Sequence, residues 1–542
     1  MKPGWKKVAI ALFAIAILAG GAWGNRVLAL TDEARRLLRT YTELLNVAHD
    51  SYAGEVSYRT LVESSIAGMV RTLDPHSNFL SSEAYSSMRD RQQSTFFGLG
   101  ILVGMRNGQL TVITPIEGTP ASRMGLRAGD VISNIEGEST EAMSLDDAVR
   151  RLKGPKGTQV TIQVVRLGLD RPLELTITRD EIPQNTVRYA YMISPGIGYM
   201  SISDFNRGTG GEVAETLDRL KAEGMENLIL DLRGNGGGLL DQAIAVSDRF
   251  LPDGAQIVET RGRTRDSHQK FFATDKPPAI DIPVVVLVGQ GTASAAEIVS
   301  GAIQDHDMGL IVGTPTWGKG LVQTVYSLQY DAGLALTTAK YYTPSGRLIQ
   351  RDYSSYFDYQ TLSNGGGLSP TEAAQENALE SEEVFRTALG REVYGGGGIT
   401  PDVIVEPQDL RPEIQYLLSR STFFDFAVEF TGEIEIGDRA WQPPSDLLER
   451  FADWLSDKEL TTAKETADIL ADEETRATML RYLHAEIFNS AFGIEARYQI
   501  LAAGDPQIER ALELLGEASD LLAKRRILDE VPDVAPASAI GG

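Results

Sequence analysis

Apolar positions follow different periods in successive parts of the chain. Near the start, residues 33–52 and 58–73 repeat apolar side chains every third or fourth position, which predicts amphipathic helices. Short β-branched runs broken by glycine follow, and Asn107-Gly108 lies between two of them, which predicts a hairpin. Beyond residue 185, runs typical of strands alternate with helical stretches. This alternation requires crossover connections and predicts a largely parallel sheet.

These changes of pattern predict several domains, because a chain of 542 residues is too long for one core. The expected fold class is multidomain α+β, with an α/β core, an inserted β-rich domain and helical N- and C-terminal segments. The predicted parts are a leader at 1–29, a helical segment at 30–92, the β-rich domain at 93–180, the core at 181–407 with a surface insertion at 355–395, and a separate helical segment at 408–542.

The first residues have the pattern of a signal peptide or a membrane anchor. Lys2, Lys6 and Lys7 precede the apolar run at 8–24. We therefore expect export to the periplasm or cell envelope, with the inner membrane as partner if the leader stays uncleaved. The chain has no cysteine, so disulfides, cysteine nucleophiles and cysteine-based metal sites are excluded.

Charge and histidine spacing narrow the function further. The formal net charge of −24 argues against nucleic acid as a partner, because phosphates would be repelled. None of the five histidines has metal-ligand spacing such as HExxH, so we predict no metal and no cofactor.

A serine after a buried strand is the first candidate for chemistry. The apolar run at 282–288 predicts the strand, and a glycine-rich turn leads from it to Ser294 at the start of a predicted helix. A hydroxyl there lies beside unpaired backbone N–H groups, which can stabilise an anion on a substrate carbonyl. Lys319, flanked by glycines, is a candidate base. Yet Ser294 to Glu297 also fits a capping box, and most lysines are solvated, so both interpretations remain open.

The glycine-rich stretch "DLRGNGGG" at 231–238 is the second candidate. It lacks the lysine of a phosphate-binding P-loop and the G-x-G-x-x-G spacing of a dinucleotide site. It differs by one residue from the "GNSGG" of trypsin-like proteases, with Gly236 in place of the serine, which excludes that chemistry. A loop of exposed amides that holds a carbonyl or oxyanion remains, with a tight structural turn as the alternative.

The β-rich domain resembles a PDZ domain, through "FFGLGI" at 96–101, "GLRAGDVI" at 125–132 and the order of its predicted elements. The resemblance implies that a loop near the start of the domain binds a C-terminal carboxylate and that the adjoining strand pairs with the peptide. That loop consists of Phe97, Gly98, Leu99 and Gly100.

The whole arrangement is similar to carboxyl-terminal processing peptidases, also called tail-specific proteases, which use a Ser–Lys dyad. The leader, the PDZ domain, "DLRGNGGG", "TASAAEI", "GKGLVQT" and "YYTPSGRLIQ" occur in family order over about residues 31–407. The resemblance implies a crotonase/ClpP-like protease core, with Ser294 as nucleophile, Lys319 as general base and Gln323 as the group that orients the lysine. It also implies an oxyanion hole from the backbone N–H groups of Ala295 and Gly237.

Arg166, on a late strand of the PDZ domain, is a candidate link between ligand binding and the protease, with an ordinary surface arginine as the alternative. Many relatives have Asn and Pro where this chain has Gly234 and Gly236. This difference leaves the identity of the oxyanion donor open.

A Ser–Lys dyad requires a lysine with a lowered pKa and a nearby group that orients it. A free lysine has a pKa of about 10.4, and burial in an apolar pocket is needed to lower it. A fully extended chain would separate Lys319 from Gln323 by roughly 13 Å, so the turn or the side chains must bring them together. His306 is excluded as the base because it would lie roughly 18 Å from Ser294 along the predicted helix.

We therefore predict an exported serine endopeptidase whose substrates are proteins with accessible C-termini. An activating or adaptor protein and self-association are partner classes that the sequence leaves open. Two other functions are considered. An acyl-CoA enzyme would use similar glycine loops to polarise thioesters, and a non-catalytic scaffold would use only the PDZ domain to bind tails.

Overall fold

The computed structural model of the protein describes residues 32–274, 280–352, 384–461 and 470–530. The chain divides into two compact units, Met1–Ser82 with Val325–Leu336 and Glu83–Thr324 with Thr337–Gly542. The predicted leader at 1–29 lies outside the described residues, and among those described no helix is long and apolar enough to cross a membrane.

The first unit contains the two predicted amphipathic helices, which are confirmed. Its elements are α2 (Asp32–Ser51), α3 (Tyr58–Val70) and β1 (Asn78–Leu80), and β1 pairs antiparallel with the start of β18 (Gly333–Tyr342).

The β-rich domain of the second unit is an antiparallel sheet in the order β3-β4-β5-β7-β8, with β6 paired to β5. Asn107 and Gly108 join β3 to β4 with φ of 48° and 76°, so the predicted hairpin is confirmed. The elements are β3 (Ile101–Arg106), β4 (Gln109–Pro115), α5 (Pro120–Arg123), β5 (Val131–Ile135), β6 (Glu138–Ser139), α6 (Leu145–Leu152), β7 (Gln159–Val165) and β8 (Leu173–Thr178). Before these elements, α4 (Ser82–Gln92) leads into β2 (Thr95–Gly98). Strand β2 pairs with β9 (Asp180–Pro183), which follows the elements of the domain.

The core is a six-stranded sheet in the order β10-β11-β12-β15-β16-β21. All neighbouring strands are parallel except β10 and β11, so the prediction of a largely parallel sheet is confirmed. Its strands and helices are β10 (Val187–Ser194), β11 (Ile197–Ile202), α7 (Thr209–Ala222), β12 (Asn227–Asp231), α8 (Leu240–Asp248), β15 (Val284–Val288), α9 (Ala295–Asp305), β16 (Leu310–Gly313) and β21 (Val403–Ile404).

Other strands of the chain form a second sheet. This sheet contains β13 (Gln256–Gly262), β14 (Gln269–Phe272) and β17 (Leu321–Ser327), and both β13 and β17 pair with β18. Of the predicted insertion at 355–395, residues up to 383 lie outside the described ones. The rest contains the hairpin of β19 (Val384–Arg386) and β20 (Glu392–Tyr394).

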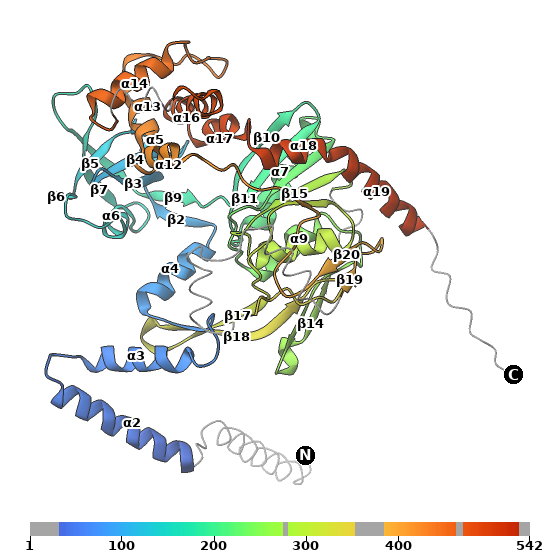
Figure 1. Cartoon of the computed structure of the whole chain (residues 1–542). Helices are drawn as coiled ribbons and strands as arrows, with labels where there is room; N and C mark the ends of the chain where they lie inside the picture. The colour runs from blue at the N-terminus through green and yellow to red at the C-terminus, as the bar shows by residue number, and fades with distance from the viewer. Residues whose placement is uncertain (1–31, 275–279, 353–383, 462–469, 531–542) are drawn as a thin grey trace, which may run out of the picture. The chain divides into compact units, whose positions relative to one another are not determined.

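Successive residues of the core strands belong to two different apolar clusters. Leu228 and Leu230 pack with α7, α8 and α9, whereas Ile229 packs with residues of α18 (Pro506–Glu513) and α19 (Leu515–Glu530). Figure 1 shows α18 and α19 in red beside the core strands. A parallel sheet needs cover on both faces, and here the end of the C-terminal segment covers one of them. The expectation that 408–542 is separate from the core is therefore wrong for α18 and α19.

The remaining helices of the C-terminal segment share an apolar core of their own, rich in phenylalanine. Within the described residues they are α12 (Pro412–Ser419), α13 (Thr422–Glu433), α14 (Leu447–Asp457), α16 (Glu473–Phe492) and α17 (Ile494–Ala502).

Candidate active site

Ser294 occupies a strained turn between β15 and α9. Every residue of β15 and of α9 is buried, so the turn between them is fixed at both ends. Ser294 has φ of 55° and ψ of −114°, a backbone conformation that a residue with a side chain rarely adopts. Strain of this kind persists only where the surroundings impose it, and it is concentrated at functional sites.

Lys319 lies two residues before the start of β17, after Gly318, whose φ is 86°. Its Nζ donates to Oε1 of Gln323 at 2.8 Å, so the side chains meet despite the separation expected for an extended chain. Burial lowers the pKa of Lys319, and the negative charge of Glu297 opposes this shift. A lowered pKa and a fixed position both favour an amine that accepts a proton as a general base.

Glu297 connects the serine turn to the lysine turn. Its Oε2 accepts hydrogen bonds from the backbone N–H groups of Ser294 at 2.7 Å and Lys319 at 3.0 Å. Its Oε1 accepts from Gly318 N at 2.8 Å and Thr316 Oγ1 at 2.5 Å. The side chain is fully buried; burial raises its pKa, and these four donors act in the opposite direction. The sequence indicated only a helix cap at this position.

Tyr341 connects the same two turns through their carbonyl groups. Its hydroxyl donates toward the carbonyl oxygens of Ser294, at 3.0 Å, and Lys319, at 2.6 Å. The tyrosine comes from β18, is 1% exposed, and has its pKa raised by burial. Sequence reasoning missed Tyr341, although it is the first residue of the quoted motif "YYTPSGRLIQ".

The glycine loop after β12 lies directly against the serine. A Cβ on Gly237 would come within 2.8 Å of both Ser294 Cβ and Ala295 N, and Gly237 has φ of 94°, so only glycine fits. The Gly237 N–H, expected as an oxyanion donor, donates here to Asn235 Oδ1 at 2.8 Å. The Ala295 N–H has no acceptor among the described residues. Of the two expected donors, only Ala295 is free in this conformation.

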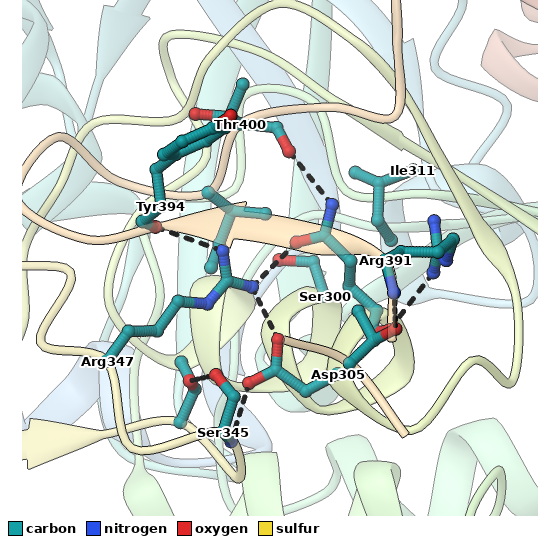
Figure 2. A network of polar contacts seen from close by, with 12 residues as sticks. Ser300, Asp305, Ile311, Ser345, Arg347, Arg391, Tyr394 and Thr400 are labelled. Carbon is teal, nitrogen blue, oxygen red and sulfur yellow. Dashed lines mark hydrogen bonds and ion pairs between the residues drawn. The ribbon is translucent and has the colours of Figure 1, made fainter. Parts of the chain in front are cut away.

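The far end of α9 is held by a buried polar network (Figure 2). Asp305 ends the helix, where the helix dipole disfavours negative charge. Arg347 compensates, because its Nη2 donates to Asp305 Oδ1 and Gln304 Oε1, both at 2.7 Å, and both ion-pair partners are fully buried. Arg391 donates to Asp307 Oδ1 at 2.6 Å. These contacts fix the helix that presents Ser294 at its other end.

His306 does not lie beside Ser294. His306 follows the last residue of α9, at the opposite end from Ser294, and its Nε2 lies 2.7 Å from Gln256 O. Its exclusion as a base is confirmed. Within the described residues, no group of three or more His, Asp or Glu side chains could hold a metal ion.

The four residues that were expected to bind a C-terminal carboxylate lie in two kinds of structure. Phe97 and Gly98 belong to β2 and pair with β9, so only Leu99 and Gly100 form a connection to β3. Strand β3 is an edge of its sheet. Arg166 forms a bidentate ion pair with Asp130, with both bonds at 2.7 Å, inside the β-rich domain. Its role as a link to the protease stays a prediction.

The sequence of the chain matches two protein families. The profile of peptidase family S41 matches residues 196–354, and that of the PDZ domain matches residues 111–166. A carboxy-terminal-processing protease of Bartonella bacilliformis is 42% identical over 340 residues, which cover 62% of this chain and 74% of the relative. A carboxyl-terminal-processing protease of Synechocystis is 38% identical over 331 residues, covering 60% and 74%.

Among solved structures, the photosystem II D1 C-terminal processing protease is 27% identical, covering 70% of this chain and 94% of its own, with a TM-score of 0.35. The sequence matches alone settle the family. This chain belongs to peptidase family S41, with the carboxy-terminal processing proteases, and it is a serine-type peptidase with a PDZ domain.

Proposed function

We propose that the protein is an endopeptidase in which Ser294 attacks the scissile carbonyl and Lys319 accepts the serine proton. The observation that carries the proposal is the lysine amine, which is partly buried, has a lowered pKa and is fixed by Gln323 at 2.8 Å. Glu297 and Tyr341 tie the backbone of both residues together. Lys319 then returns the proton to the leaving amine, and water hydrolyses the acyl-enzyme in a second cycle.

The negative charge of the tetrahedral intermediate needs backbone donors beside Ser294. Ala295 N–H supplies one of them. A second comes from the glycine loop, and Gly237 can contribute if its N–H leaves Asn235 as substrate enters. Each such donor is worth about 2.7–4 kcal/mol of transition-state stabilisation. The parallel sheet and these loops also support a crotonase/ClpP-like architecture for the core.

Hydrolysis of an unfolded protein such as casein tests the dyad. Wild type, Ser294→Ala and Lys319→Ala are compared at equal concentration, with thermal unfolding as the check on folding. Both substitutions are expected to abolish hydrolysis, because each removes a partner of the proton transfer. Gln323→Ala is expected to retain a reduced rate, since the lysine keeps its burial but loses its orienting bond. Full activity of either dyad variant refutes the assignment.

We further propose that substrates are recognised by their C-termini through the PDZ domain. An edge strand such as β3 can pair with an extended peptide, and the turn at Leu99 and Gly100 precedes it. The test compares a protein substrate ending in a free carboxylate with the same substrate ending in an amide. Amidation is expected to lower kcat/KM, and equal values for the two forms would refute tail recognition.

Export is proposed from the leader at 1–29 alone. Expression of the full chain followed by cell fractionation and mass determination of the N-terminus tests it. Recovery of the uncleaved chain in the cytosol contradicts export, whereas a membrane-bound or trimmed chain supports it.

A further inference from the structure

We propose that Asp505 and Gln507, from the C-terminal helical segment, are positioning residues for the peptidase site because they hold Arg233 of the glycine loop. Arg233 Nη1 donates to Asp505 Oδ2 at 2.8 Å and to Gln507 Oε1 at 2.7 Å. The proposal rests on the function proposed for Ser294. It gives residues beyond the matched family region, 196–354, a role in the reaction.

The rest of the guanidinium group holds the end of β12. Arg233 Nε and Nη2 donate to the two carboxylate oxygens of Asp231 at 3.0 Å and 2.7 Å, and Tyr199 donates to the same carboxylate at 2.7 Å. One planar side chain therefore joins a core strand to the start of α18. The side chains of Arg233 and Asp505 are only 23% and 24% exposed, so solvent screens this pair less than a surface pair.

The residues on either side of Arg233 contact the serine turn. Leu232 O accepts from Thr292 Oγ1 at 2.8 Å, and Asn235 O accepts from Ala293 N at 2.9 Å. Between them, a Cβ on Gly291 would come within 2.9 Å of Gly234 Cα, so the two loops are in direct contact. Movement of Arg233 is thereby transmitted to the backbone amides beside the nucleophile. Catalysis is sensitive to such shifts because the donors must already face the developing charge.

The start of α18 is itself fixed in place. Asp505 Oδ1 caps the helix by accepting from Gln507 N at 2.9 Å and Ile508 N at 3.2 Å. Gln507 Nε2 donates to Val405 O, just beyond β21, at 2.7 Å. Because α18 packs on the core sheet, its contacts with Arg233 come from a rigid support (Figure 1). The C-terminal segment thus determines where the glycine loop lies.

The test uses full-length Asp505→Asn, which keeps a good helix cap and removes the charge that faces Arg233. We expect kcat on an unfolded protein to fall about tenfold with KM changed less than about twofold, since the loss affects the transition state more than substrate binding. Gln507→Ala is expected to act in the same direction. The matched control is Glu486→Gln, which removes the charge from a pair that is at least as buried, Glu486 with Arg497 at 2.7 Å, within the same segment. This control should stay within about twofold of wild type.

Hydrogen exchange supplies a readout that general destabilisation would not give. In Asp505→Asn, amides of residues 232–239 should exchange faster, while those of α16 stay protected. Wild-type kcat in Asp505→Asn, or an equal loss in Glu486→Gln, overturns the proposal. Hydrolysis that survives Ser294→Ala would instead overturn the proposed function. The two failures are therefore distinguishable.

Discussion

Replacing Glu297 by glutamine tests whether one buried carboxylate holds the two halves of the site together. The carboxylate accepts four hydrogen bonds, two at each oxygen. An amide oxygen placed at Oε2 keeps the bonds from Ser294 N and Lys319 N. The amide nitrogen then lies at Oε1, where it can donate to Thr316 Oγ1 but repels Gly318 N–H. This orientation leaves the Gly318 N–H buried without an acceptor, at a cost of about 1–3 kcal/mol, and the Thr316 hydroxyl must turn its proton away from position 297.

This cost is measurable as a shift in thermal unfolding. For a cooperative unit of about 150–250 residues, 1 kcal/mol corresponds to about 2–4 °C, so Glu297→Gln should melt about 2–12 °C below wild type. Differential scanning calorimetry measures the shift, and casein hydrolysis measures the accompanying fall in kcat. The fall is expected because the Gly318 turn that presents Lys319 loses a contact.

The matched control is Glu212→Gln in the first turn of α7. Glu212 also accepts several hydrogen bonds, which are partly buried, but Thr186 N, Thr186 Oγ1 and Val187 N all donate to the single oxygen Oε2. Glutamine can keep all of them and loses only a favourable charge near the helix N-terminus, worth about 0.3–1 kcal/mol. The reasoning is refuted if Glu297→Gln melts and hydrolyses like wild type, or if the control is destabilised equally.

Three further outcomes follow from the buried charges. Burial lowers the pKa of Lys319 in the folded state below its ordinary 10.5. At a pH below this folded-state pKa, the charged amine therefore destabilises the folded protein. This destabilisation decreases as the pH rises and disappears near pH 10.5, where the amine is also neutral in the unfolded chain. Lys319→Met should be inactive yet melt higher than wild type at neutral pH, with the gain vanishing near pH 10.5; a gain that grows with pH would contradict this. In wild type, kcat/KM should rise with pH through an apparent pKa below 10.5. Glu297→Gln should move this rise to lower pH, because the negative charge of Glu297 raises the pKa of Lys319. A rise that moves to higher pH would contradict the coupling between the two residues. Arg347→Met should destabilise the core by about 3–5 kcal/mol by leaving Asp305 buried and unpaired, and addition of Asp305→Asn should recover part of the loss, as urea unfolding would show; no recovery would mean that the unpaired charge is not the cause.

Local sequence patterns predicted much of the fold and the main candidate residues of the site. The period of apolar residues predicted the N-terminal helices, the Asn107-Gly108 hairpin and the parallel core. The glycine-rich stretch at 231–238 predicted a loop of exposed amides or a tight turn, and within it Gly237 has φ of 94° and lies against Ser294. Such features depend on neighbours in the chain, and for this reason they can be read from sequence.

Residues that act across long separations were not predictable in this way. Glu297 looked like a helix cap, and its bonds to Gly318 and Lys319 depend on a turn more than twenty residues away. Tyr341 carries no local mark of its contacts with Ser294 and Lys319. A buried polar side chain must find partners, but the sequence does not say which ones.

The sequence by itself determined that the run at 282–288 is a buried strand and that a serine follows it at the start of a helix. It did not determine what covers the second face of the sheet. The tertiary structure alone decided that α18 and α19 do so, and that Asp505 thereby reaches Arg233 beside the glycine loop. The physical reason is that apolar burial is non-directional: a strand shows that it needs cover, whereas the covering element is selected by packing of the whole chain.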